Sequence, residues 1–134
     1  INENDGAALI IDYGTATSAP GDSLQAVQNH LYVPVLVAPG SADLTAHVDF
    51  SALVRTAEAA GVAAHGPVTL GSFLESLGIE LRATALRQNA TPEQTDDLDT
   101  AVARLTAPDQ MGDLFKVLAL ARRDQLPPAG FSAP

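Results

Sequence analysis

One short apolar run near the amino terminus constrains the fold more than any other feature of this sequence. Residues 7–13 lie between Gly6 and Gly14 and have the length and composition of a strand buried on both faces of a parallel sheet. Such a strand needs neighbours, which predicts an α/β protein. Ligands of open parallel sheets bind beyond the carboxyl ends of strands, so Asp12, Tyr13 and Gly14 form a candidate site. The alternative is that Asp12 caps a turn while Tyr13 packs.

Two more segments have strand character. Residues 114–121 are apolar, although their alanine and leucine content leaves a helix open, and Lys116 indicates one partly exposed face. Residues 62–68 are weakened as a strand by Gly66 and Pro67, which favours an edge position over a central one.

The first predicted helix follows Asp49 or Ser51, either of which can cap it. An apolar stripe and a terminating glycine support this helix over residues 50–60: Phe50, Leu53, Val54, Ala57 and Gly61. We expect it to pack on the sheet.

The second half of the chain predicts further helices, over residues 69–77 and 79–89. Thr91, Pro92 and Gln94 then combine a cap, a proline at the first helical position and a reciprocal capping box. The helix that starts there carries one apolar stripe and ends at a proline: Leu98, Ala101, Val102, Leu105 and Pro108.

Turn-forming residues mark the remaining parts as irregular. Residues 14–43 read as an excursion from the core, and long excursions at strand ends are usually functional or mobile. The sequence contains no repeat or second core, so we expect one domain over residues 1–126 and an irregular, proline-rich tail over 127–134.

Composition excludes several classes of function. The net charge of −9, from 16 acidic and 7 basic residues, provides no basic face and argues against nucleic acid as a direct partner. No apolar run reaches the roughly 20 residues of a membrane span, and the amino terminus lacks the order of a signal peptide, so we expect a soluble cytoplasmic protein. The absence of cysteine excludes disulfides, thiolate metal sites and a cysteine nucleophile.

The polar motifs alone do not identify a reaction. Neither a phosphate-binding glycine loop nor the serine motif of hydrolases occurs, and the scattered His30, His47 and His65 predict no metal site. His47 and Asp49 flank one residue, so an extended backbone would place both on one side as a paired imidazole and carboxylate. The alternative is that Asp49 caps the helix beside a hydrogen-bonded histidine.

An ordered set of motifs resembles the MidA-type family of S-adenosylmethionine-dependent methyltransferases. The matching segments are GAALIIDYG at 6–14, GDSLQA at 21–26, DLTAHVDF at 43–50, GPVTLGSFL at 66–74, LGI at 77–79 with Arg82, RLTAP at 104–108 and MGDLFKV at 111–117. Together these segments cover nearly the whole chain. One departure is Leu70, where the family usually has glutamine.

The resemblance implies the carboxyl-terminal part of a class I methyltransferase, with a Rossmann-like sheet and a helical insertion. Residues 7–13 correspond to its fifth strand, 50–60 to the following helix, and 62–68 with 114–121 to the closing antiparallel pair. The glycine-rich half that binds S-adenosyl-L-methionine would precede Ile1, so no cofactor-binding residue is expected here. Without that half, the strand at 7–13 would have an open edge.

The resemblance also implies an activity, methylation of an arginine side chain on a protein, which in mitochondrial members serves assembly of respiratory complex I. Asp12 and His47 are then the candidate catalytic residues. The candidate substrate-binding residues are Tyr13, Gly14, Gln25 and Asp49. The alternative is a non-catalytic assembly or scaffold domain that binds a partner protein.

Overall fold

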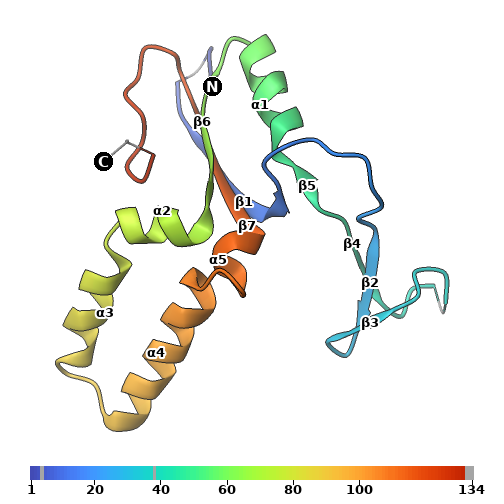
Figure 1. Ribbon diagram of the computed structural model, residues 1–134. Helices are drawn as coiled ribbons and strands as arrows, with labels where there is room; N and C mark the ends of the chain where they lie inside the picture. The colour runs from blue at the N-terminus through green and yellow to red at the C-terminus, as the bar shows by residue number, and fades with distance from the viewer. Residues whose placement is uncertain (4, 38, 132–134) are drawn as a thin grey trace.

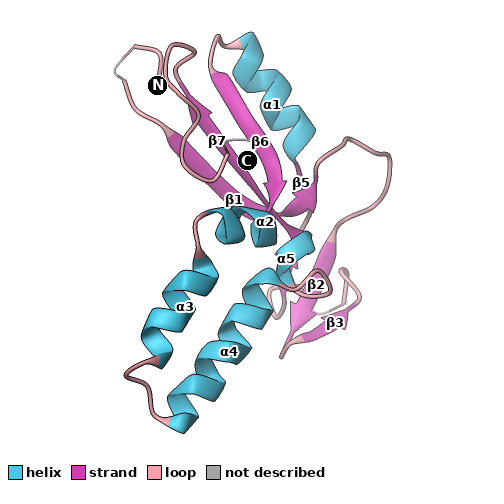
Figure 2. Ribbon diagram, turned by 60° about the vertical axis from the view of Figure 1, so that its left-hand side comes forward, coloured by secondary structure: helices cyan, strands magenta, loops and turns pink. Residues whose placement is uncertain are grey.

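The computed structural model describes residues 1–3, 5–37 and 39–131, and within them the chain is an α/β structure (Figures 1 and 2). Its strands are β1 (Ala8–Thr15), β2 (Gln25–Gln28), β3 (Leu31–Val33), β4 (Asp43–Thr45), β5 (Val48–Asp49), β6 (Ala63–Thr69) and β7 (Phe115–Ala121). Its helices are α1 (Phe50–Ala59), α2 (Leu70–Ser76), α3 (Ile79–Arg87), α4 (Pro92–Thr106) and α5 (Met111–Leu114).

The main sheet has the strand order β5-β1-β7-β6. β1 runs parallel to β5, whereas β7 is antiparallel to both β1 and β6. All three strands expected from the sequence are therefore present. β6 lies at the sheet edge, as Gly66 and Pro67 predicted, and β6 with β7 forms the expected antiparallel pair.

The prediction that the first strand is buried on both faces is wrong. Leu9 and Ile11 of β1 are 53% and 47% exposed, whereas Val117 and Leu118 of β7 are fully buried. Leu9 and Ile11 alternate with half-buried Ala8 and Ile10, so one face of β1 is uncovered within the described chain. Residues 8–13 also pair only with β7 there. The open edge expected for this strand is therefore present among the described residues.

Helix α1 forms as its sequence predicts. The Asp49 carboxylate accepts a hydrogen bond from the Ala52 amide at 3.0 Å and caps the helix. Phe50 and Ala57 are buried where α1 packs against β1, β6 and β7, and Gly61 follows the helix with a left-handed φ of +79°.

The predicted helical insertion is present as α2, α3 and α4. α3 and α4 form a hairpin that projects from the sheet (Figure 1). The capping box at the start of α4 is confirmed, with Thr91 and Gln94 exchanging hydrogen bonds of 3.0 and 3.3 Å. Val102 is buried as expected, but Ala101 is exposed because the hairpin covers only a narrow face of α4.

One helix was not expected, the single turn α5 before β7. It packs against α2 and α4. Gly112 permits this contact, because a Cβ atom there would lie 2.1 Å from the Thr106 carbonyl oxygen.

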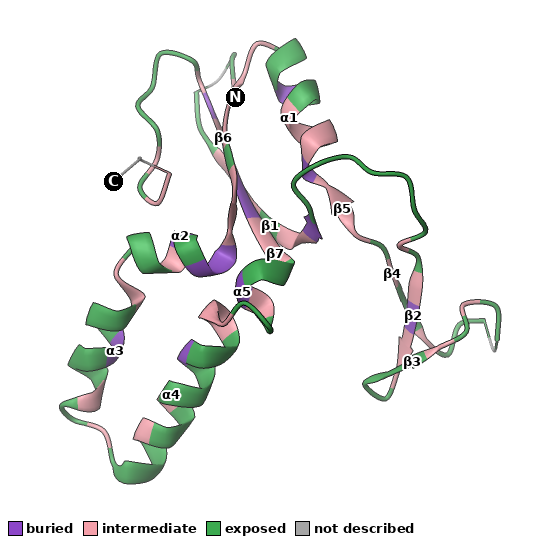
Figure 3. Ribbon diagram, in the orientation of Figure 1, coloured by how far each residue is buried: buried purple, intermediate pink, exposed green. Residues whose placement is uncertain are grey.

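The core gathers where β7 meets α2, as the purple segments of Figure 3 show. Leu70, Phe73 and Val117 form its buried centre. Leu70, the residue that departs from the family pattern, is thus a core residue only 5% exposed. The tail is irregular up to residue 131, as predicted, but Phe131 returns to pack on Phe73 with ring centroids 5.2 Å apart. The rest of the predicted tail, residues 132–134, lies outside the described residues.

A small β lobe replaces part of the predicted excursion. β2 lies between β3 and β4 in a second, three-stranded sheet beside the main one (Figure 1). Asn29 and His30 both adopt positive φ, 50° and 63°, in the turn between β2 and β3, which suits the twist of a two-residue hairpin. These strands are only three or four residues long, which is too short for a clear alternating pattern, so the sequence did not predict them.

Candidate functional site

A groove lies at the carboxyl ends of β1 and β5. The two parallel strands meet here, with Thr15 opposite Asp49. The groove encloses about 240 Å³ between these strand ends and the loop that follows β1. Its lining residues are Thr15, Ala19, Pro20, Gly21, Asp22, Ser23, His47 and Asp49. This position is where open α/β sheets bind their ligands.

Gly14 allows the two strands to approach each other. A Cβ atom at this position would lie 2.1 Å from the carbonyl oxygen of Val48, which belongs to backbone and cannot rotate away. The groove therefore depends on the absence of a side chain at Gly14. This role is structural, and substrate contact by Gly14 remains a prediction.

His47 and Asp49 line the same groove, as their spacing predicted. Asp49 also caps α1, so the alternative interpretation of this carboxylate is correct as well. The Ser18 hydroxyl, the Ala52 amide and nearby Arg55 hold the pKa of Asp49 below its usual value, with Ser18 the largest cause. Asp49 therefore carries a negative charge into the groove at neutral pH.

An aromatic cluster supports the histidine. The Tyr13 ring meets the His47 ring edge-on at a centroid distance of 5.7 Å, and on another side it meets Phe115 at 5.5 Å. The His47 amide donates a hydrogen bond of 3.3 Å to the Ser23 hydroxyl. Backbone and ring contacts thus orient His47, while no described residue hydrogen-bonds to its imidazole.

Four candidate residues are not among those that line the groove: Asp12, Tyr13, Gly14 and Gln25. Tyr13 contacts the lining residue His47 through its ring, and Gly14 lies at the contact between β1 and β5. Successive side chains of a strand alternate between faces, so Asp12 lies on the opposite face of β1 from Tyr13. One Asp12 oxygen accepts the Tyr13 amide at 2.8 Å, and the residue opposite in β7 is Lys116. Gln25 begins β2 opposite Thr45. Within the described chain, neither Asp12 nor Gln25 contacts His47 through a hydrogen bond or strand pairing.

Besides Thr15 and Ser23, three polar side chains at or beside the groove were not among the candidates. Asp22 lines it, Ser18 hydrogen-bonds to Asp49 at 2.6 Å, and Arg55 reaches Ser18 at 3.3 Å. Of these three, only Asp22 could have been chosen from the sequence, because it belongs to the family-like segment at 21–26. The other two come close through the fold of the loop over the start of α1.

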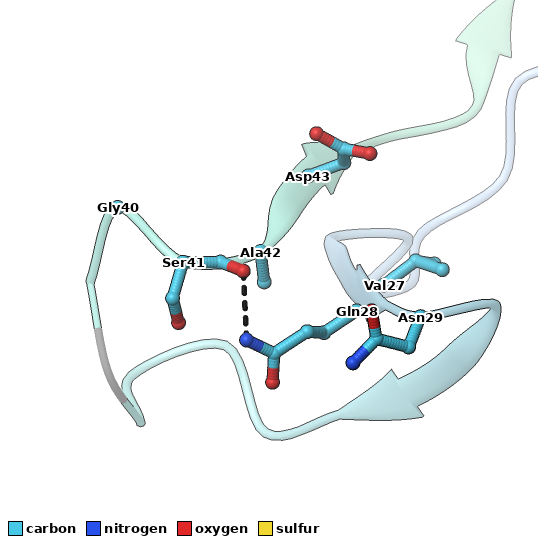
Figure 4. Close-up of a pocket in the computed structure, with 7 residues that line it drawn as sticks. All are labelled: Val27, Gln28, Asn29, Gly40, Ser41, Ala42 and Asp43. Atoms are coloured by element: carbon cyan, nitrogen blue, oxygen red, sulfur yellow. Dashed lines mark hydrogen bonds between the residues drawn. The ribbon is translucent and has the colours of Figure 1, made fainter.

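Two other pockets have few or no charged side chains. A wide hollow on the β lobe, about 340 Å³, includes Asp43 among mostly small or uncharged residues, and the Gln28 side chain is bonded there to the Ser41 carbonyl at 2.9 Å (Figure 4). A cavity of about 220 Å³ beneath Phe131 is lined by apolar residues. The described residues include no cluster suited to a metal ion and no helix long and apolar enough to cross a membrane.

The described residues do not form the cofactor site that the resemblance assigns to an upstream half. Such a site needs a glycine-rich turn between a strand and the start of a helix. In the described chain, β5 leads into α1 through the Asp49 carboxylate and β6 leads into α2 through the Thr69 hydroxyl. Both helix starts are capped by side chains, and neither junction has a glycine-rich turn. These residues by themselves therefore do not fit S-adenosyl-L-methionine.

Relatives named as methyltransferases match nearly the whole chain. It is 40% identical over 139 aligned residues to a Drosophila melanogaster protein named "Protein arginine methyltransferase NDUFAF7 homolog, mitochondrial", and 38% identical over 144 to the Danio rerio protein of that activity. Each alignment covers 98% of this chain but only 32% and 34% of the relative. The chain thus spans about a third of the length of these curated relatives.

Two solved structures share the fold. An uncharacterized protein from Burkholderia thailandensis matches 96% of this chain with a TM-score of 0.85 and 31% identity. A second structure from that organism, of a likely methyl transferase bound to S-adenosyl-homocysteine, matches 95% with a TM-score of 0.81 and 29% identity. The chain covers 36% and 34% of these two structures.

The family assignment rests on the first half of the chain. Residues 1–68 match the family described as "Putative S-adenosyl-L-methionine-dependent methyltransferase". These residues include β1, the β lobe and the groove. The resemblance seen in the sequence is therefore confirmed, and the chain belongs to this family of S-adenosyl-L-methionine-dependent methyltransferases.

Proposed function

We propose that this chain is the carboxyl-terminal, substrate-side part of a longer methyltransferase that acts on arginine side chains of proteins. The observation that carries the proposal is 40% identity to a protein arginine methyltransferase over 98% of the chain. An upstream segment would hold S-adenosyl-L-methionine, which supplies the methyl group. Residues 1–126 would then complete the methyltransferase domain.

The groove suits a cationic, planar acceptor group. Arginine methylation requires that the guanidinium be held and turned so that one nitrogen faces the methyl donor, because such a transfer depends on positioning. Carboxylates bind guanidinium groups through charge-assisted hydrogen bonds, and flat rings pack against their planes. Asp22 and Asp49 place two carboxylates in the groove, and His47, whose ring meets that of Tyr13, supplies a flat ring.

His47 has a second task in this proposal. The methylated nitrogen releases a proton, and an imidazole can accept one near neutral pH. His47 lines the groove, and its imidazole has no hydrogen-bond partner among the described residues. We therefore assign proton acceptance to His47, either directly or through water.

The test uses the complete protein and His47→Ala. We expect a loss of methyl transfer of about 100-fold or more, the size typical of general base removal, with unchanged cofactor affinity and thermal stability. Tyr32→Ala, a side chain 77% exposed on the lobe, is the control for a lost aromatic ring. Normal turnover in His47→Ala, or destabilisation that accounts for the lost activity, would remove His47 from the reaction.

The acceptor protein is a finer proposal. The resemblance to mitochondrial family members points to a respiratory complex I subunit, and the curated relatives named above are mitochondrial proteins. Asp12 remains a proposed catalytic residue and Gln25 a proposed substrate contact, which would require that the acceptor reach beyond the groove.

A further inference from the structure

We infer that Asp22 is the carboxylate that binds the substrate guanidinium, and that Asp49 instead holds the groove in shape. This inference rests on the proposed function and adds the residue that makes the site specific for arginine. Both carboxylates line the groove, so their hydrogen bonds decide between them.

Asp49 is already engaged through both oxygens. Its Oδ1 accepts the Ala52 amide at 3.0 Å, and its Oδ2 accepts the Ser18 hydroxyl at 2.6 Å. Arg55 donates to Ser18 at 3.3 Å and supplies a neighbouring positive charge. Asp49 therefore ties the loop after β1 to the start of α1, and a guanidinium would have to compete with these contacts.

Asp22 has one carboxylate oxygen that can still accept a hydrogen bond, whereas both oxygens of Asp49 already do so. Its Oδ1 accepts the Leu24 amide at 3.0 Å, which fixes the carboxylate relative to the backbone. No donor within the described chain reaches the other oxygen. The side chain is exposed at the groove, so an incoming donor meets an oriented acceptor at little cost in side-chain entropy.

The charge distribution of the chain favours a cation at this place. Residues 1–54 contain no lysine or arginine, whereas all seven basic residues follow from Arg55 onward. The described residues that line the groove include Asp22 and Asp49 but no lysine or arginine, and Arg55 beside it hydrogen-bonds to the hydroxyls of Ser18 and Ser51. Two carboxylates in a groove that no lysine or arginine lines attract a cationic side chain and repel anions.

The geometry also distinguishes arginine from lysine. A guanidinium offers a planar fork of donors and a flat face, whereas an ammonium is a compact point charge. The His47 ring lines the groove, and its edge-on contact with Tyr13 at an interplanar angle of 73° holds it in orientation. A guanidinium can bond to Asp22 with its edge while its plane packs on the His47 ring.

The experiment compares Asp22→Asn with the unchanged complete protein on an arginine peptide. Asparagine keeps an oxygen for the Leu24 amide but removes the charge, so the loop should retain its turn. We expect KM for the peptide to rise about 10- to 100-fold, as for loss of a charge-assisted hydrogen bond. The expected changes in kcat are below about threefold, with S-adenosyl-L-methionine affinity and Tm unchanged.

Asp43→Asn is the matched control, because it removes the same charge from an exposed position on the neighbouring lobe. An unchanged KM in Asp22→Asn, or equal increases in both variants, would overturn the inference while the proposed function stands. Absence of arginine methylation by the unchanged protein would instead refute the proposed function. If Asp22→Asn lowers Tm, Asp22→Ser, which also retains an acceptor for the Leu24 amide, is measured in its place against the same control.

Discussion

Replacement of Gly14 by alanine tests how the groove is built. The added Cβ atom would lie 2.1 Å from the Val48 carbonyl oxygen and 2.9 Å from the backbone carbon and nitrogen of the same residue. No side-chain rotation relieves these contacts, so β1 and β5 must separate by about 1 Å to restore van der Waals distances. Overpacking of this kind costs about 1–3 kcal/mol, to which weakened β1–β5 hydrogen bonds add about 1 kcal/mol.

Urea denaturation of the complete protein measures this cost. Gly14→Ala should lower the free energy of unfolding by about 2–4 kcal/mol, the sum of these two contributions. It should also raise KM for the substrate, because Val48 separates His47 from Asp49. Gly21→Ala serves as the stability control, since a Cβ there would contact no atom within 4 Å. Equal stability of both variants would refute the close approach of the strands.

Two further predictions concern capping and acid stability. Thr91→Ala removes one half of the capping box of α4 and should lower the free energy of unfolding by about 1 kcal/mol in chemical denaturation. The control, Thr100→Ala at an exposed position of the same helix, should not lower it, and equal losses in both variants would contradict the role of the cap. The pKa of Asp49 is lowered in the folded chain, so its stabilising contribution is complete above the unfolded value and disappears as pH falls through the lowered one. In Asp49→Asn, the free energy of unfolding should therefore fall less steeply with decreasing pH below about pH 4 than in the unchanged protein. The same pH dependence in both proteins would contradict this.

Local signals predicted the helices well. Asp49 and Thr91 cap α1 and α4 as their sequence positions indicate, because a cap needs only residues within one turn. The strand at 7–13 was also found, but its apolar composition could not show whether both of its faces would be covered in this chain. Leu9 is thus exposed in the described chain, although its sequence context is that of a buried strand.

The site was predicted only where its residues are close in sequence. His47 and Asp49 lie two positions apart in an extended segment, which was enough to place both in one groove. Asp22 and Ser18 reach the same region through a loop with no regular structure, so no periodicity marked them. The burial of Leu70 likewise depends on contact with Val117, far along the chain.

The most direct measurement of the central claim is a crystal structure of the complete protein with S-adenosyl-homocysteine and an arginine peptide. We predict that the cofactor product contacts mainly residues upstream of this chain. The guanidinium should lie in the groove, bonded to Asp22 and packed beside His47. A cofactor product seated in this groove, or a peptide arginine bound elsewhere with the groove empty, would contradict the account.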